Sequence, residues 1–495
     1  MAALLLRPDA VLPGSDAMTP KFGWTVAIEN GAILAAGPDA AEAVPGAETL
    51  SLPGCLLMPG LVNAHQHGRG LTQVQLGFPD LILEAWQTLK RRRGWLDPAA
   101  MVPLAALRML AAGTTACIHA NTAWGRANQE DDLLRTIDAY DAAGLRAIVG
   151  VGVQDRASLV FPAEEQSAFF ASLPEALRAV VGEPDPPVFA RTAAEAEALF
   201  DRLAERLPAH GRIGLCFAPA GPQWVSDGVF EAVAAAARRR GAPLHLHALE
   251  SVAQAGAAQR LYPEGTLARL ASLGVLGPAT SIAHAVHVTG REATIAAETG
   301  TILVRNPSSN LRLGCGAAPL AEWLAAGVRV AIGTDNQTLD DTEDLWTELR
   351  LAAALAALPS WHAPPRPDPA TLLLMATENG AAALGLSGRI GRIAPGFRAD
   401  LVALDLERLR GAYADPGLPL ESLLTARASA ASVRMTMVDG RVLYRDGEFP
   451  HLDADAVAAA AARAAEGSRA VVAEREERVA QLVEAVAAFH RARWR

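Results

Sequence analysis

Short apolar runs alternate with amphipathic, alanine-rich stretches through the middle of the chain, from about residue 59 to residue 384. One unit predicts a helix over 227–240, a stop at Gly241 and a strand over 243–248. The same order returns twice, with helices over 291–298 and 320–326 and strands over 301–304 and 328–332. Repeated helix–glycine–strand units are typical of a parallel α/β fold, and the length of the region predicts a (β/α)8 TIM-like barrel.

The two ends of the chain carry a different pattern, in which short strands are broken by glycine and proline. Such strands are expected over 25–28, 32–35, 55–58, 400–404 and 433–438. They predict one small β-sandwich domain formed by both chain ends, from residues 1–58 and 385–450, around the barrel at 59–384. Residues 451–495 are rich in Ala, Glu and Arg with helical spacing, and predict a C-terminal helical extension that carries no chemistry.

Composition narrows the class of protein. The 495 residues are 51% hydrophobic and 20% charged, as in a globular chain, and the net charge of −10 gives no general attraction to nucleic acid or to an anionic membrane. The four cysteines are widely spaced, which favours neither a disulfide framework nor a cysteine zinc site. The apolar start is too short for a signal peptide, and no apolar run approaches the roughly 20 residues of a membrane helix. We therefore expect a cytoplasmic enzyme.

Two histidines one residue apart, His65 and His67, end an apolar strand. Positions i and i+2 of a strand point the same way, so both imidazoles would face one point. Neutral imidazole is the commonest nitrogen ligand of zinc and iron. Taken alone, the pair fits two structural histidines equally well.

A later strand offers a further ligand and an acid. By chemistry alone either His245 or His247 could bind a metal, and we interpret His245 as a structural histidine of the strand. Glu250 lies just past the strand end, where a carboxylate could reach a substrate, although a solvated loop glutamate fits the same position.

Two more strands end in candidate groups. His284 could bind the metal or polarise water or substrate, whereas His287 is expected in a supporting or structural place. Asp335 closes the strand at 328–332, where capping of a helix is the alternative. Three histidines and one carboxylate, with one position open, are typical of a catalytic metal site.

With these residues in place, the chain resembles the amidohydrolase superfamily, in the branch of cytosine, guanine and S-adenosylhomocysteine deaminases and triazine hydrolases. The resemblance covers nearly the whole chain. Besides the residues above, it includes the segments 306–311, 333–335, 348–351, 376–380 and 391–402.

The resemblance implies the roles of the site residues. One divalent metal ion, Zn²⁺ before Fe²⁺ or Mn²⁺, would be held by His65, His67, His247 and Asp335. Glu250 would move protons to the substrate nitrogen, and His284 would hold the attacking water or the developing oxyanion. Asp335 would also accept the proton of the water and pass it to the leaving group.

Lysine is nearly absent, since only Lys21 and Lys90 occur. Two-metal members of the superfamily bridge their ions with a carbamylated lysine of the barrel. Lys21 lies in the predicted β domain, and Lys90 follows the first barrel strand in a basic run. The composition therefore predicts a site with a single metal ion.

Three positions depart from the pattern of many relatives: Arg305 and Ala220 each replace an expected His, and Gln66 replaces a Thr. We hypothesise that Arg305 faces the pocket and pairs with a carboxylate or carbonyl of the substrate, a structural salt bridge being the alternative. Further pocket candidates are Trp86, as a stacking surface, His119, Asn121, Gln154, Arg156 and Gln223.

The sequence thus predicts a mononuclear hydrolase of C–N bonds that deaminates a nitrogen heterocycle such as a purine, pyrimidine, pterin or triazine. One alternative is opening of a cyclic amide, or removal of an alkylamine or halide from a heterocycle. Another is a catalytically silent scaffold. The expected partner is a small heterocyclic substrate, with no nucleic acid or membrane, and the resemblance implies a homodimer.

Overall fold

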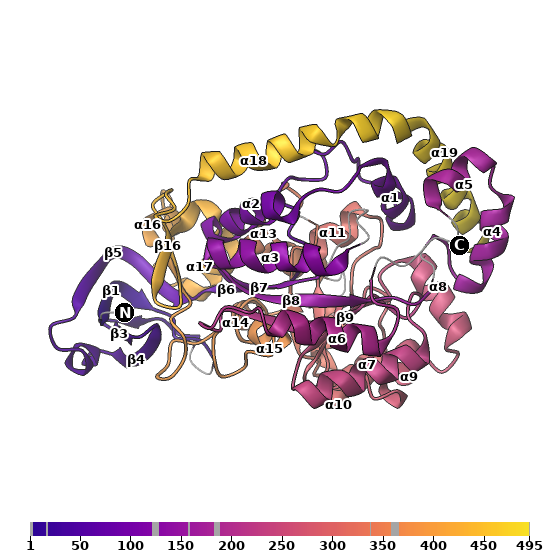
Figure 1. Cartoon of the computed structure of the whole chain (residues 1–495). Helices are drawn as coiled ribbons and strands as arrows, with labels where there is room; N and C mark the ends of the chain where they lie inside the picture. Colours follow the sequence, from indigo (N-terminus) through magenta and orange to yellow (C-terminus); the bar gives the residue numbers. More distant parts are fainter. Residues whose placement is uncertain are drawn as a thin grey trace.

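Eight parallel strands form the central sheet, and they lie in their order along the chain, from β6 to β13. Figure 1 labels the first four of them, β6 to β9. The strands are β6 (Leu61–Gln66), β7 (Thr114–His119), β8 (Arg146–Val153), β9 (Ile213–Pro219), β10 (Leu244–Ala248), β11 (Thr280–His284), β12 (Ile302–Arg305) and β13 (Val330–Ile332). The backbone N–H of Asp335 donates to the carbonyl of His65 at 2.9 Å and joins the last strand to the first. The predicted (β/α)8 barrel is confirmed.

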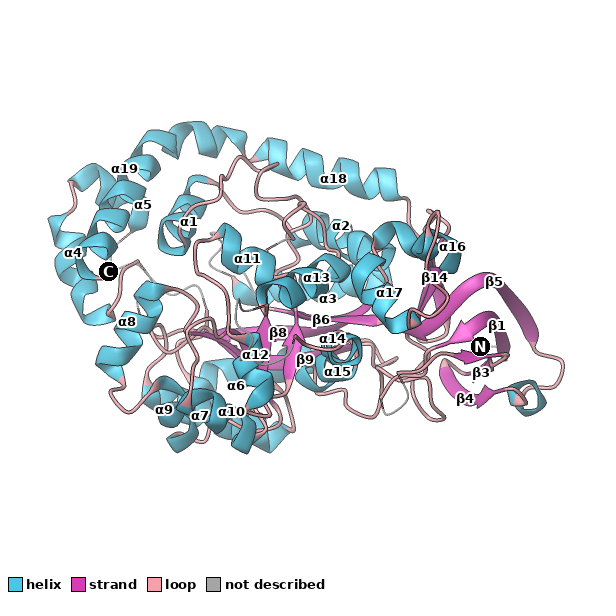
Figure 2. Ribbon diagram, turned by 180° about the vertical axis from the view of Figure 1, so that it is seen from behind, coloured by secondary structure: helices cyan, strands magenta, loops and turns pink. Residues whose placement is uncertain are grey.

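The computed structural model describes residues 3–15, 18–120, 128–156, 159–182, 189–336, 338–357 and 366–494. The helices of the barrel region are α1 (Leu83–Leu89), α2 (Pro98–Ala111), α3 (Gln129–Ala143), α4 (Gln166–Ser172), α5 (Glu175–Val181), α6 (Ala193–Ala204), α7 (Asp227–Arg240), α8 (Val252–Leu261), α9 (Thr266–Ser272), α10 (Arg291–Thr299), α11 (Pro307–Arg312), α12 (Leu320–Ala325), α13 (Leu345–Leu355), α14 (Pro369–Met375) and α15 (Glu378–Ala383). Figure 2 shows them around the strands of the barrel.

Helix α12 illustrates why the glycine stops marked the right places. Gly327 follows it with a left-handed φ of 82°, and the N–H of Val328 returns to the carbonyl of Trp323 at 2.9 Å. This closure of the helix end occupies Val328, so the strand begins at Val330 and not at 328 as expected. Gly241 and Gly300 end α7 and α10 in the same way.

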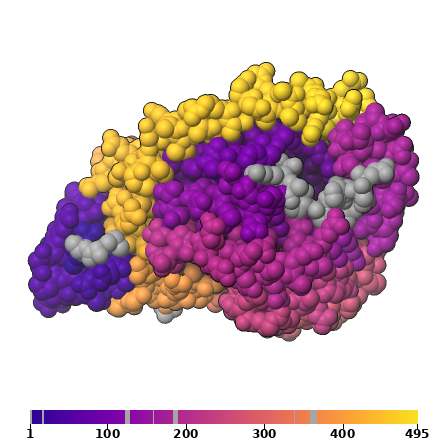
Figure 3. Space-filling view, viewed as in Figure 1, coloured from indigo at the N-terminus to yellow at the C-terminus, as the bar shows by residue number. Residues whose placement is uncertain are grey.

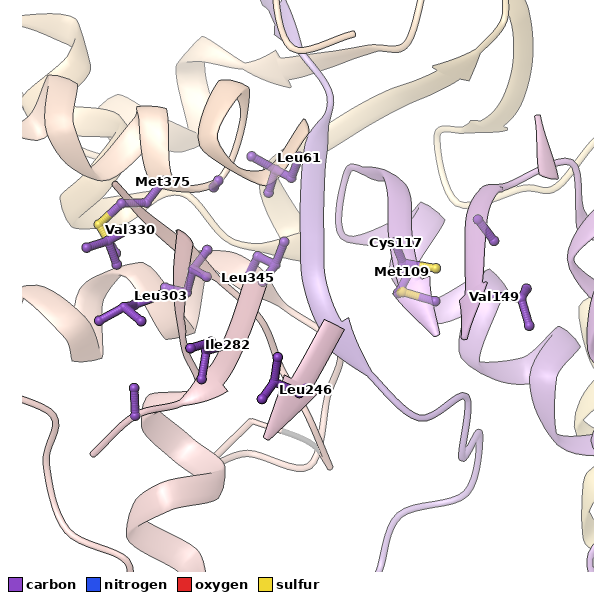
Figure 4. Close-up of a cluster of buried hydrophobic side chains, with 14 of the residues drawn as sticks. Leu61, Met109, Cys117, Val149, Leu246, Ile282, Leu303, Val330, Leu345 and Met375 are labelled. Atoms are coloured by element: carbon purple, nitrogen blue, oxygen red, sulfur yellow. The ribbon is translucent and has the colours of Figure 1, made fainter. Parts of the chain in front are cut away.

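The strands of the barrel present apolar side chains to both faces. On β12, Ile302 and Val304 belong to an inner cluster that includes α15, whereas Leu303 packs in the outer cluster with Leu345 of α13. Figure 4 shows part of this outer cluster, which lies between the strands and the surrounding helices. Side chains of successive strand residues alternate between the faces, so this assignment fixes the direction of every neighbour in β12.

The two ends of the chain meet in a second sheet, as predicted. Its strands are β1 (Leu4–Val11), β2 (Lys21–Phe22), β3 (Thr25–Glu29), β4 (Ala32–Gly37), β5 (Glu48–Pro59), β14 (Leu401–Asp405), β15 (Val433–Val438) and β16 (Arg441–Arg445). Antiparallel pairing of β14 with β5, with Leu401 opposite Pro59, joins the two pieces. The strands form one continuous sheet, β16-β15-β14-β5-β1-β3-β4 with β2 beside β1, and helices α16 (Leu406–Arg410) and α17 (Leu420–Arg427) follow β14.

A buried ion pair joins the barrel to this second sheet. Arg146, at the start of β8, donates to both carboxylate oxygens of Asp400 at 2.6 and 3.0 Å, and to Asp439 at 3.2 Å. We expect Arg146→Met to lower the free energy of unfolding by about 3–5 kcal/mol, because it leaves the buried carboxylate of Asp400 without its cation, whereas Asp439 keeps Arg398. Urea denaturation measures this, and an unchanged midpoint would contradict it.

The C-terminal extension is helical, as predicted, with α18 (Ala454–Gly467) and α19 (Arg469–Arg493) following one another along the outside of the barrel (Figure 3). Arg92 pairs with Glu476 of α19 at 3.1 Å, and Trp494 packs on Gly256 of α8. The extension therefore braces segments near the carboxyl ends of the strands. In the described part of the chain, no helix has both the length and the apolar character to cross a bilayer.

Candidate metal and catalytic site

The first and last strands of the barrel bring three of the predicted ligands together. Nε2 of His67 lies 3.0 Å from Oδ1 of Asp335, and Nε2 of His65 lies 3.3 Å from the same oxygen. Gly333 permits this approach, since a Cβ there would lie 2.6 Å from the carbonyl oxygen of His65. His247 contributes from β10, with its ring centroid 4.8 Å from that of His65.

The other nitrogens of these histidines are held by the protein. Nδ1 of His67 lies 2.8 Å from the carbonyl oxygen of Ala120, and Nδ1 of His247 lies 3.1 Å from that of Ala220. A proton on Nδ1 leaves the lone pair of Nε2 facing the centre, as in metal-binding histidines. Nε2 of His65 is buried without a hydrogen-bond partner among the described residues. This donor set fits a divalent metal ion.

His245 is a structural histidine of the strand, as interpreted from the sequence. Its Nε2 lies 2.8 Å from Nδ1 of His65, and its Nδ1 lies 2.7 Å from the hydroxyl of Ser281. Both nitrogens are therefore occupied, and the chain from Ser281 through His245 orients His65.

Asp335 is held on its other side by α11 and by its own neighbour. Its Oδ2 accepts hydrogen bonds from Ser309 and from Asn336. Burial opposes ionisation of Asp335, but the neighbouring imidazoles of His65, His67 and His284 hold its pKa well below the usual value. The helix that follows, α13, is capped by Asp344 and not by Asp335.

Glu250 and His284 lie beside the ligand cluster, as predicted. Oε1 of Glu250 is 3.5 Å from Nδ1 of His284, and the same Nδ1 lies 2.9 Å from Oδ1 of Asn310. One ligand atom from each of Glu250, His284 and Asp335 lies within 4.8 Å of the others. Burial, with repulsion from Asp335 and Glu84, raises the pKa of Glu250 to about 7 against the opposing charge of His284. A carboxyl with this pKa can both donate and accept a proton near neutral pH.

The backbone turns sharply where these groups sit. His284 and Asp335 have left-handed φ values of 70° and 52°, and Leu249, before Glu250, has 52°. Non-glycine residues adopt this region at a cost, and such strain is common at functional sites. The sequence carried no signal of it.

The prediction that Arg305 faces the pocket is wrong. It lies on the same face of β12 as Leu303, so it points outward to α13, where it donates to the carbonyl of Ala352 at 3.1 Å. The charge of Glu348 in α13 opposes the effect of burial on Arg305. The alternation of side chains along a regular strand decides which way Arg305 points. The presence of Arg where many relatives have His gave no indication of that direction.

The remaining pocket candidates follow strand ends. His119 contacts the hydroxyl of Tyr140 at 3.1 Å, and Gln154 donates to the carbonyl of Arg156 at 2.9 Å. Nη1 of Arg156 and Nε2 of Gln223 are buried donors without a partner among the described residues. Asn121 lies outside the described residues, and Trp86 is 2% exposed with cations over its ring. Their contact with a substrate stays a prediction.

Sequence reasoning missed the residues that hold the site: Asn63, Ser281, Ser309 and Asn310. Oδ1 of Asn63 accepts the backbone N–H groups of His65 and of Thr334, so one amide fixes both strands that carry ligands. The small polar residues of 306–311 were noted only as part of the resemblance. Their position directly after a barrel strand was the available signal.

Comparison with known proteins agrees with this geometry. Residues 56–443 match the amidohydrolase family. A 5-methylthioadenosine/S-adenosylhomocysteine deaminase of Nitratidesulfovibrio vulgaris is 33% identical over 471 residues, which cover 92% of this chain and 95% of that protein. A 5′-deoxyadenosine deaminase of Methanosarcina mazei is 30% identical over 94% of this chain and 98% of its own length. The crystal structure of a zinc-bound adenosine deaminase from Xanthomonas campestris has a TM-score of 0.78 at 29% identity, covering 94% of this chain and 98% of that one.

Proposed function

Because this chain belongs to the amidohydrolase family, we propose that it removes an amino group from a nitrogen heterocycle by hydrolysis, at a single zinc ion. The observation that carries the proposal is the convergence of His65, His67 and Asp335 beside Glu250. His65, His67, His247 and Asp335 would hold the ion. When bound, the ion supplies Lewis acidity, which makes water a competent nucleophile at neutral pH.

The residues of the chain divide the proton transfers. Asp335, whose pKa is low, accepts a proton from the attacking water. Glu250, with a pKa of about 7, delivers a proton to the ring nitrogen next to the carbon under attack, and Asp335 passes the proton of the water on to the leaving amine. His284, oriented by Asn310, donates or accepts at the oxygen that adds to the ring.

Ammonia release from a panel of heterocycles tests the activity. The names of the relatives make 6-aminopurine nucleosides the first compounds to assay, followed by aminopyrimidines, pterins and aminotriazines. Release of ammonia with formation of the oxo product supports deamination. A product with an opened ring, or release of alkylamine or halide without ammonia, would instead support the other hydrolytic reactions.

We expect the purified protein to contain one zinc ion per chain by elemental analysis. Chelation should abolish ammonia release and lower the melting temperature, because the folded state alone assembles the four ligands. Re-supply of zinc should restore both. Full activity at less than about a tenth of an ion per chain would contradict the proposed site.

We further infer that the protein acts in the cytoplasm and forms a homodimer. The similarity to known deaminases supports these two assignments. Sedimentation of the purified protein tests the second.

A further inference from the structure

The side chains of the basic run from Lys90 to Arg93 do not all point the same way. Arg93 donates to the carbonyl of Ala465 at 3.0 Å and also to the hydroxyl of Ser468, so it braces the C-terminal extension, as Arg92 does. Lys90 does not join them. Its Nζ lies 4.6 Å from the centroid of the Trp86 ring, one turn back in α1.

Trp86 links Lys90 to the proposed catalytic groups. The indole packs in a buried cluster with Val286, two residues after His284, and with Cys315. Sγ of Cys315 lies 3.9 Å from Oε1 of Glu250. Trp86, which Lys90 contacts, therefore belongs to the cluster that borders Glu250.

A second cation lies against the ring of Trp86. The guanidinium carbon of Arg69 lies 5.3 Å from the centroid of the same Trp86 ring, and Arg69 itself is 4% exposed. Burial and the charge of Arg69 lower the pKa of Lys90 to about 7, partly opposed by Asp335 and Glu250. Lys90 and Arg69 thus both lie against the Trp86 ring, whose cluster reaches Glu250 through Cys315.

No carboxylate of the described residues pairs directly with Lys90. The lysine makes neither a hydrogen bond nor an ion pair with the described residues, and its contact with Trp86 attracts the ammonium without neutralising it. A cation removed from bulk water without a counter-ion is costly, so an anionic ligand would be favoured there. Lys90 nevertheless keeps part of its surface exposed, so a ligand can reach it.

We propose that Lys90, backed by Trp86 and joined by the charge of Arg69, binds an anionic group of the substrate. The inference rests on the proposed function and narrows it: the substrate is an amino heterocycle that carries a carboxylate or a phosphate ester. Lys90 is a specificity residue in this assignment and takes no part in the proton transfers.

Binding of matched ligands to the full-length, zinc-loaded protein tests the proposal. The pairs are pterin with pterin-6-carboxylate, and adenosine with adenosine-5′-carboxylate and with adenosine 5′-monophosphate. Titration calorimetry gives the ratio of dissociation constants within each pair for wild type, Lys90→Met, Lys90→Arg and the control Lys21→Met. Lys21, in β2 of the second sheet, is the other lysine of the chain.

We expect wild type to prefer an anionic member, and Lys90→Met to weaken its binding roughly 10- to 100-fold with little effect on the neutral partner. Lys90→Arg should keep most of the preference, and Lys21→Met all of it. Comparison of the carboxylate ligands with the phosphate ester shows which of the two anions the site binds. A wild type without preference for any anionic member, or a preference that survives in Lys90→Met, would overturn the proposal. Binding is measured independently of turnover. If wild type prefers an anionic member, Lys90→Met loses that preference and wild type releases no ammonia, the anion site is supported and the deamination is rejected.

Discussion

Replacing Glu250 with glutamine should lower kcat for ammonia release by about 10²- to 10⁴-fold, the usual contribution of a positioned proton donor and acceptor. Glutamine keeps the size of the side chain and the hydrogen bond with Gln254, but it cannot transfer a proton. Steady-state kinetics should place the loss in kcat, with KM nearly unchanged, because the residue acts on the reacting atoms and not on binding.

Glu348→Gln is the matched control for this change. Glu348 is also a buried glutamate, and burial raises its pKa to about 8, but it lies on α13 behind the barrel, where it accepts the N–H of Ser308 at 3.0 Å. Its replacement should leave kcat within a few-fold of wild type. Equal losses in the two variants would show that Glu250 acts through folding, and would remove it from the mechanism.

Glu250→Gln should also change how the stability of the protein depends on pH. The pKa of Glu250 is about 7 in the folded protein and about 4.3 in an unfolded chain, so the folded state favours the protonated form. The stabilisation of the folded state by this preference is complete below pH 4.3 and is lost as the pH rises through 7. Glu250→Gln does not titrate, so its melting temperature should exceed that of wild type at pH 8 by more than at pH 5. An equal difference at both values would contradict the raised pKa.

Asp335→Asn should impair metal binding as well as catalysis. It weakens the contacts with His65 and His67, removes a charged ligand and removes the acceptor of the water proton. Since a bound metal contributes several kcal/mol to such a reaction, we expect ammonia release to fall by about 10³-fold or more. Elemental analysis should find substoichiometric zinc in the same preparation.

Asp344→Asn provides the control, because Asp344 is a buried aspartate of the same segment that caps α13 through the N–H of Trp346 at 2.9 Å. Asparagine is also a good cap, so zinc content and kcat should stay close to wild type. If Asp335→Asn kept one zinc per chain and near-normal kcat, Asp335 would be neither a ligand nor a proton acceptor.

Some features of this protein were local and could be predicted from the sequence. Glycines at the ends of α7, α10 and α12 mark the turns because few other residues adopt a left-handed φ, so the repeating units of the barrel were evident. The spacing of His65 and His67 places both on one face of a strand. Polar groups at the carboxyl ends of successive strands were predicted to meet, since the ends of parallel strands lie together.

Only the tertiary structure decided the directions of individual side chains. Whether Arg305 points inward depends on which face of β12 meets α15 and which meets α13, and those helices are distant in sequence. The choice between His245 and His247 depends on Ser281 in the neighbouring strand, and the place of Lys90 depends on how α1 packs on Trp86 and Cys315. Composition and periodicity report on residues that are close together in the sequence. The site is formed by residues that are distant in the sequence, and these come into contact only after the barrel has closed.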